Sequence, residues 1–164
     1  MTVSNAISLL QSRAAEGQDL PEELFRFVSS ITPLVNVDLL IKDEHNRTLL
    51  TWRDDEHYGA GWHVPGGIIR FKEHAQERIQ KVAHQEVGCA VDAESVPLLV
   101  AENIAHTRER GHFISFLYRC RLLGQPKAAL AAFGTPKRGQ WRWFEGAPPD
   151  LLPVHHVYAQ FLMS

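Results

Sequence analysis

Cysteine is scarce in this chain, which contains two among 164 residues, Cys89 and Cys120. They do not form a CxxC pair, so they provide neither a zinc motif nor the framework of a disulfide-stabilised fold. We expect both to be small buried hydrophobic residues, and we expect the protein to work in a reducing, cytoplasmic compartment.

Long apolar segments and an excess of one charge are also missing. No apolar run approaches the roughly 20 residues that a helix needs to cross a bilayer, and the formal net charge is −2. The segment 1–18 lacks the basic start, apolar centre and cleavage site of a signal peptide. We therefore expect neither a membrane nor a nucleic acid as partner.

What the chain does contain is enough apolar sequence, 45%, for one folded domain over residues 1–164. Helical spacing over 4–15 and 21–30 predicts a helical extension at residues 1–30, and 34–53 is typical of a β-hairpin. The segment 54–67 is polar and rich in glycine, as loops are. The remaining predicted elements are a helix over 73–87, strands over 96–107, 112–123 and 141–144, and a helix from 154. This irregular order predicts an α+β fold with a mixed sheet packed against helices.

The helix over 73–87 carries a carboxylate on its apolar side. At about 100° per residue, Glu86 lies within about 60° of Ile79, Val82 and Ala83. Either the helix frays before Gly88 and leaves Glu86 in solvent, or Glu86 faces a metal, a cation or hydrogen-bond donors. Helix geometry alone leaves both open. The preceding glycine pair at 66–67, which lets a ligand approach bare backbone, favours a metal–diphosphate site.

The stretch 61–89 resembles a Nudix box, a loop–helix–loop motif. Its glycine, two of its glutamates and its closing glycine are matched by Gly67, Glu73, Glu86 and Gly88. Three charged positions of the family pattern are replaced, by Lys81, Val82 and Gln85. The sequence is similar to GDP-mannose mannosyl hydrolases, which also lack two of the box glutamates, and the similarity includes TPLVNVDLLI (32–41), LLTWR (49–53) and GWHVPGG (61–67).

The resemblance implies a Nudix fold, an α/β/α sandwich with a mixed sheet between helices, and a homodimer. It also implies a hydrolase that uses Mg²⁺ (or Mn²⁺) to cleave a nucleotide sugar such as GDP-mannose into GDP and sugar. Two alternatives stay open. One is a Nudix pyrophosphatase with a different nucleotide substrate, and the other is an inactive Nudix domain that binds a nucleotide ligand.

The resemblance also assigns roles to individual residues. The metal ligands would be Glu86, the carbonyl of Gly67, and Glu73. Arg53 would bind the diphosphate and take part in catalysis, and Asp38 would lie near the leaving group or the sugar. Further substrate contacts are expected from Gly66, Gly67, Lys81, Lys137 and Arg138.

The family's catalytic base is not matched in this chain. GDP-mannose mannosyl hydrolases carry a Gln-His pair before the last strand, where this sequence has Lys137 and Arg138. Arginine cannot act as a base near neutral pH. His106 and His112 flank a turn and are the candidate replacements, the alternative being two surface histidines.

Three further histidines are candidates for a role at the site or at the surface: His63, His155 and His156. His63 either contacts a ligand or packs in its loop. His155 and His156 are adjacent on a helix, so they cannot bind one metal together, and surface positions are expected for both.

Overall fold

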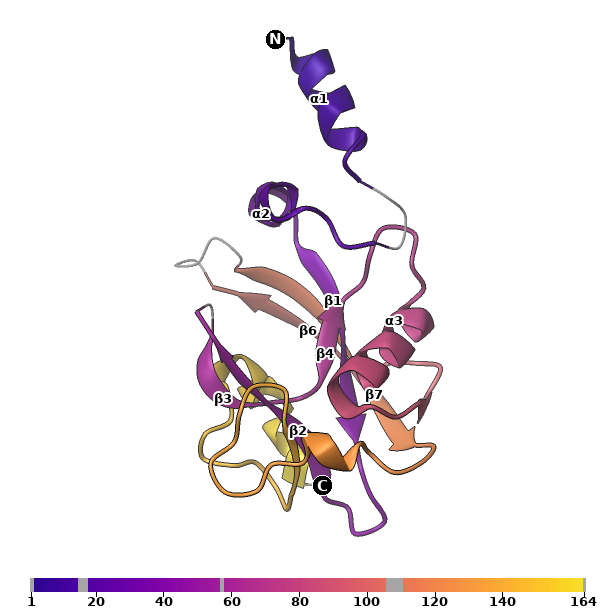
Figure 1. Ribbon diagram of the computed structural model, residues 1–164, viewed down its shortest axis with the longest axis vertical. Helices are drawn as coiled ribbons and strands as arrows, with labels where there is room; N and C mark the ends of the chain where they lie inside the picture. Colours follow the sequence, from indigo (N-terminus) through magenta and orange to yellow (C-terminus); the bar gives the residue numbers. More distant parts are fainter. Residues whose placement is uncertain (1, 15–17, 57, 106–110, 164) are drawn as a thin grey trace.

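The computed structural model describes residues 2–14, 18–56, 58–105 and 111–163 (Figure 1). The helices are α1 (Val3–Gln11), α2 (Glu22–Ile31), α3 (Ala75–Val82), a π-helical turn (Ala83–Val87), two 3₁₀ segments (Ala128–Leu130 and Pro153–Tyr158) and α4 (Ala159–Met163). The strands are β1 (Leu34–Ile41), β2 (Thr48–Asp55), β3 (Gly59–His63), β4 (Gly66–Ile68), β5 (Val91–Ala93), β6 (Leu99–Ile104), β7 (His112–Leu122) and β8 (Trp141–Phe144).

These strands form two sheets. The larger has the order β4-β1-β7-β5, and β6 also pairs with β7. Within it β1 and β7 run parallel, whereas the other pairs are antiparallel. The smaller sheet is antiparallel, in the order β3-β2-β8. The predicted α+β fold with a mixed sheet and packed helices is confirmed.

The predicted hairpin over 34–53 is wrong. β1 and β2 belong to different sheets and share one isolated bridge, between Lys42 and Thr48. The apolar content of β1 has another cause, which is that it lies between β4 and β7 and is buried on both faces. Strands buried on both faces are near-continuously apolar. The apolar content of β1 therefore does not indicate which strand pairs with it.

The segment expected to be a polar loop, 54–67, is also more ordered than predicted, because it forms β3 and the start of β4. Trp62 anchors β3 with 2% of its surface exposed, between the rings of Trp52 and Phe144. Gly61, which suggests a loop here, serves close packing instead, because a Cβ at this position would lie 2.6 Å from Leu152 Cδ2.

The side chains of β1 divide between two apolar cores. Val37, Leu39 and Ile41 face the first core, which α3 covers with Ile79 and Val82. The opposite face of β1 contributes to a second core between the sheets, whose other members include Leu50, Trp62, Leu117, Tyr158 and Leu162. The period-two alternation predicted for β1 is therefore present, and it places polar residues at positions 36 and 38 on the second face.

The N-terminal extension lies outside these cores. α1 has no buried residue and projects from the rest of the chain, while α2 buries Leu24 and Ser29 (Figure 1). Cys120 is buried as expected, and burial raises the pKa of its thiol to about 12, whereas Cys89 is half-buried. In the described part of the chain, no helix combines the length and apolar character of a membrane span.

Candidate metal and diphosphate site

The glycine pair at 66–67 passes between β1 and α3. β4 pairs with β1 so that Gly66 lies opposite Asp38 and Gly67 opposite Val37. A Cβ at Gly66 would overlap Asp38 Oδ1, and one at Gly67 would lie 2.7 Å from Val82 Cγ2. Both positions therefore require glycine for packing, and this packing brings the β4 backbone against a carboxylate.

Glu86 lies on a π-helical turn that continues α3. The backbone N–H of Gly88 donates to the carbonyl of Ala83 at 3.0 Å, which gives the wider i→i+5 spacing. The predicted helix thus extends to Val87, but its last turn is not α-helical, so the projection at 100° per residue does not apply there. Gly88 then ends the turn in the left-handed conformation, with φ 72°.

The carboxylate of Glu86 is held by donors from β2 and β4. Thr51 Oγ1 donates to Oε2 at 2.7 Å, and the Gly66 N–H donates to Oε1 at 3.3 Å. His63 Nε2 lies 3.4 Å from Oε2. Burial works to raise the pKa of Glu86, but His63, Thr51 and the charge of Arg53 outweigh it and hold the pKa below its usual value. Glu86 is therefore an ionised carboxylate, with 24% of its side chain exposed.

Asp38 forms a second, more deeply buried carboxyl group. Its Oδ2 accepts hydrogen bonds from Tyr158 Oη at 2.6 Å and from Asn36 Nδ2 at 3.2 Å. Asn36 also donates to Ser115 Oγ at 2.9 Å. Burial raises the pKa of Asp38 to about 6, with the hydrogen bond from Tyr158 opposing the shift and the charge of Glu86 adding to it. Asp38 can therefore carry a proton close to neutral pH.

Two histidines lie between these carboxyl groups. His63 Nδ1 is 2.7 Å from the Thr51 carbonyl oxygen, and the His63 ring packs edge-on against His155 at 5.8 Å. His155 Nδ1 accepts a hydrogen bond from the Val64 N–H, and its ring contacts Tyr158. Burial, followed by the nearby charge of His63, lowers the pKa of His155 well below its usual value.

The surface position predicted for His155 is wrong, because the 3₁₀ turn at Pro153–Tyr158 presents this side chain to the interior. His156 is exposed, so the two adjacent histidines point in different directions, as expected. Tyr158 and Thr51 also belong to the site and were not predicted. Nothing in the sequence separates them from other apolar-segment residues, because their roles depend on packing between distant segments.

Asp38, Gly66 and His63 line a cavity of about 100 Å³. Arg53 lines it too, with its guanidinium over the Tyr58 ring at 5.1 Å and 3.4 Å from Asp55. The other lining residues are Asn36, Tyr58, Val64, Gly67, Ile68, Asn103, Phe113, Ser115, Val154, His155 and Tyr158. Glu86 borders this cavity through its contacts with His63 and Gly66.

Glu73 does not join this site. Its side chain is 1% exposed and contacts Arg78 Nε at 2.8 Å and Lys81 Nζ at 2.7 Å. The Arg70 N–H donates to it as well, at 2.9 Å. Burial opposes ionisation, but these donors outweigh it and lower the pKa of Glu73 to about 2. The Glu73 carboxylate and the Lys81 ammonium group already neutralise each other. This ion pair argues against the roles expected for Glu73 as a metal ligand and for Lys81 as a substrate contact.

The structure does not bring the remaining predicted residues to the cavity. Lys137 and Arg138 are exposed on the loop before β8 and do not line it. His112 Nε2 lies 3.1 Å from Glu102 at the exposed end of the β6–β7 pair. His106 lies outside the described residues.

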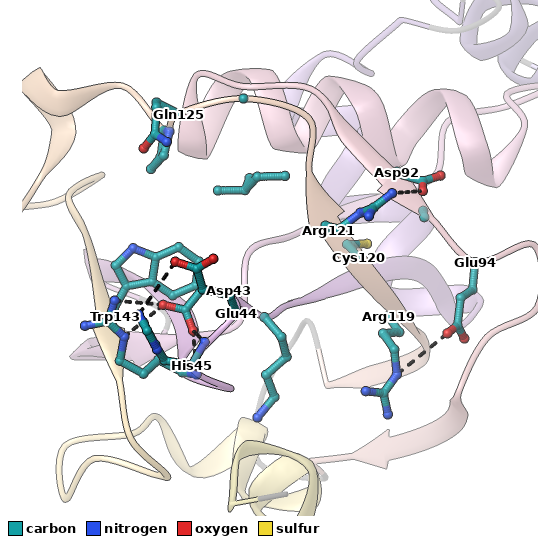
Figure 2. A pocket seen from close by; sticks show the side chains of 16 residues that line it. Asp43, Glu44, His45, Asp92, Glu94, Arg119, Cys120, Arg121, Gln125 and Trp143 are labelled. Atoms are coloured by element: carbon teal, nitrogen blue, oxygen red, sulfur yellow. Dashed lines mark hydrogen bonds and ion pairs between the residues drawn. The ribbon is translucent and has the colours of Figure 1, made fainter.

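A larger cavity, of about 750 Å³, lies at the other ends of β1 and β7 (Figure 2). Its walls carry paired opposite charges: Arg119 lies 3.7 Å from Glu94, and Arg121 lies 3.3 Å from Asp92. Trp143 forms the facing wall in Figure 2. Because its charges balance within the wall and it contains none of the box residues, its size does not make it the better candidate.

A divalent cation fits the smaller site only with help from a substrate. Among the described residues, no three His, Cys, Asp or Glu side chains converge on a common point. Glu86 is ionised and partly exposed, which suits a single carboxylate ligand. Mg²⁺ commonly binds through one or two carboxylates together with water and substrate phosphates, so the residues present fit the ion.

A mixed sheet covered by a loop–helix motif, with one inward glutamate facing a glycine pair, defines an α+β protein with a candidate cation site. Residues 32–161 match the NUDIX domain family. Since this match covers most of the chain, the chain belongs to the Nudix family. Nudix hydrolases act on nucleoside diphosphate-linked substrates and generally use divalent metals such as Mg²⁺.

Individual relatives agree with this assignment. The chain is 34% identical over 76 residues to the low-salt glycan biosynthesis protein Agl8 of Haloferax volcanii. The matched residues make up 46% of this chain and 48% of that protein, so the match spans about half the length of this relative. A MutT Nudix hydrolase from Burkholderia pseudomallei has a similar fold, with a TM-score of 0.65 and 19% identity over 80% of this chain and 98% of that one. An ADP-ribose pyrophosphatase from Streptococcus suis gives a TM-score of 0.53 and 22% identity over 80% and 87% of the two chains.

Proposed function

We propose that this protein is a Mg²⁺- or Mn²⁺-dependent Nudix hydrolase of a nucleotide sugar such as GDP-mannose, releasing GDP and free sugar. The observation that carries the proposal is the environment of Glu86, a single ionised carboxylate held by the Gly66 N–H and Thr51 beside a polar cavity. A bound divalent cation would neutralise the charge that develops on the departing diphosphate.

The replaced box positions favour attack at carbon over attack at phosphorus. Val82 is buried in the core under α3, and Gln85 is exposed, so neither position supplies a second carboxylate beside Glu86. Fewer carboxylates support fewer metal ions, and hence less activation of a water molecule for attack at phosphorus. A substrate with a good leaving group, such as a sugar linked to a diphosphate, depends less on that activation.

The side chains around the cavity suit the two halves of such a substrate. Arg53 places a guanidinium in its wall, where it can bind a diphosphate through paired hydrogen bonds. Asn36, Asp38 and Ser115 form a hydrogen-bonded group that can bind sugar hydroxyls. Asp38 can also hold the proton that a departing or attacking oxygen exchanges, because its pKa is raised to about 6. Similarity to a glycan biosynthesis protein supports a sugar-containing substrate.

The test is a panel of nucleotide sugars and dinucleotides assayed with and without Mg²⁺ or Mn²⁺ in ¹⁸O-labelled water. We expect the label in the sugar, which reports attack at carbon; label in the phosphate would replace this proposal with a pyrophosphatase. Glu86→Gln should lower kcat on the order of 100-fold or more, because a metal's electrostatic stabilisation is worth several kcal/mol. Glu77→Gln, on the exposed side of α3, is the matched control and should leave kcat unchanged.

A second candidate is a domain that binds a nucleotide ligand without turning it over. The engagement of Glu73 by Arg78 and Lys81 favours this candidate, because one further box carboxylate is then unavailable to a metal. Absence of turnover across the panel, together with tight ligand binding that does not need a metal, would select it. We further expect a homodimer, which light scattering of the purified chain measures directly.

A further inference from the structure

His63 is held in one orientation beside Glu86. It lies on β3 directly opposite Thr51 on β2. Its Nδ1 is 2.7 Å from the Thr51 carbonyl oxygen, which can only accept a hydrogen bond, so Nδ1 carries a proton. The other ring nitrogen, Nε2, is therefore the one that is open to a further partner.

Nε2 faces one oxygen atom, Glu86 Oε2, which lies 3.4 Å away. Thr51 Oγ1 lies 3.3 Å from Nε2 and 3.4 Å from Nδ1, so it approaches the ring edge between the two nitrogens. The Thr51 hydroxyl donates its proton to the nearer group, Glu86 Oε2, at 2.7 Å. The Nε2 lone pair would then face the lone pairs of Glu86 Oε2, which is unfavourable unless a positive particle lies between these two atoms. That particle is either a proton or a metal ion.

We propose that His63 Nε2 and the Glu86 carboxylate together bind one divalent transition-metal ion, and that this pair makes the site prefer Mn²⁺, Co²⁺ or Zn²⁺ to Mg²⁺. The proposal rests on the proposed function for the role of Glu86 as a metal ligand. It adds a nitrogen ligand from β3, outside the loop–helix motif that resembles the Nudix box.

The separation of the two atoms fits a shared ion. Imidazole nitrogen and carboxylate oxygen bind such ions at about 2.0–2.2 Å, so two ligands at about 90–110° lie about 3.0–3.4 Å apart. Nε2 and Oε2 are separated by 3.4 Å. The hydrogen bond from Nδ1 to a backbone carbonyl is the usual arrangement that fixes the tautomer and direction of a metal-binding histidine.

Ligand chemistry sets the preference among metals. Mg²⁺ binds oxygen and seldom nitrogen, whereas imidazole suits Zn²⁺ and Co²⁺ and is acceptable to Mn²⁺. The described residues supply no third His, Cys, Asp or Glu ligand, so water and substrate phosphate oxygens must complete the coordination. Metal affinity should therefore rise in the presence of a nucleoside diphosphate.

The direct test uses the unaltered chain. Mn²⁺ is added with GDP, and pulsed electron paramagnetic resonance records the hyperfine coupling between the manganese and nearby ¹⁴N nuclei. We expect the coupling of one directly bound imidazole nitrogen. Its absence in a sample that binds Mn²⁺ stoichiometrically would overturn the proposal, because Nε2 would then hold a proton instead of the metal.

Calorimetric titrations then assign the nitrogen to its residue. His63→Gln should weaken Co²⁺ binding at least about tenfold and Mg²⁺ binding much less. His45→Gln is the matched control, since His45 Nε2 also lies near a glutamate, 3.6 Å from Glu44 Oε1, but on an exposed turn. Equal losses for Co²⁺ and Mg²⁺, or no loss for either, would contradict a role for His63 as ligand. Circular dichroism confirms that the variants are folded.

The outcomes also separate this proposal from the proposed function. Sugar release with Mg²⁺ but no nitrogen coupling would refute the role of His63 while leaving the hydrolase intact. Nitrogen coupling without turnover of any substrate would support the metal site and refute the hydrolase.

Discussion

Replacement of Asp38 by asparagine should stabilise this protein at neutral pH. The folded chain raises the pKa of Asp38 from 3.8 to about 6, chiefly through burial. Ionising this carboxyl is therefore harder in the folded chain than in the unfolded one. Asparagine has nearly the same shape, can still accept the Tyr158 hydroxyl, and cannot ionise.

The sign and size follow from proton linkage. Between pH 3.8 and about 6 the folded chain binds more protons at Asp38 than the unfolded chain does, so the free energy of unfolding falls as pH rises. The stabilising contribution is complete below pH 3.8 and lost once pH passes about 6. At about 1.4 kcal/mol per pH unit, the loss amounts to about 3 kcal/mol. Asp38→Asn avoids it.

Urea unfolding of both proteins from about pH 4 to about pH 8 measures the effect. The unfolding free energy of Asp38→Asn, minus that of the unaltered protein, should increase by about 2.5 kcal/mol over this range, because a small part of the total loss has already occurred at about pH 4. The control is Asp92→Asn, an exposed carboxylate beside Arg121, for which the difference should stay nearly constant. A constant difference for Asp38→Asn as well would refute the reasoning, since Asp38 would then ionise as easily in the folded chain as in the unfolded one.

Two further predictions concern positions fixed by packing and charge. Glu73→Gln should lower the unfolding free energy by about 3 kcal/mol at neutral pH. The pKa of Glu73 in the folded chain, about 2, lies below its ordinary value of 4.5. This stability is therefore present above pH 4.5 and lost as the pH falls through about 2. Glu77→Gln is the control, and an equal loss of unfolding free energy in both variants would contradict the role of the buried ion pair. Gly66→Ala should cost about 1–3 kcal/mol through overlap with Asp38, measured by thermal unfolding. Gly124→Ala, whose Cβ would meet only Cys89 Sγ at an ordinary 3.5 Å, should have little effect, and similar stability of the two alanine variants would contradict the packing argument.

Local periodicity predicted the parts of the fold that local forces decide. The alternation in β1 placed Val37 and Leu39 on one face and residues 36 and 38 on the other, as the two cores confirm. The strands predicted over 112–123 and 141–144 are present as β7 and β8, and β6 lies within the predicted strand over 96–107. The order of strands in the sequence did not predict which strands pair. β1 pairs with β7, far along the chain, so the predicted hairpin was wrong.

The candidate site was predictable only in part. A carboxylate on an apolar helical stripe, together with the glycine pair, was sufficient to select Glu86, and the resemblance added Arg53 and Asp38. The sequence could not reveal that Glu73 is neutralised by Arg78 and Lys81, because a glutamate that forms such ion pairs and a glutamate that binds a metal look the same in the sequence. It could not reveal the π turn either, which depends on how the chain meets the segment around Lys127 after Gly88.

The groups that set the properties of Glu86 come from three short strands and not from its own helix. Thr51 is 35 residues away and Gly66 is 20 residues away along the chain, and His63 approaches from β3. Their positions follow from the β2–β3 register and from the path of β4 between β1 and α3. The properties of Glu86 therefore depend on these strands as well as on how many glutamates the Nudix box retains. The strands beside Glu86 determine the charge of its carboxylate, and under the proposed metal site His63 on β3 would also determine which metal ion it binds.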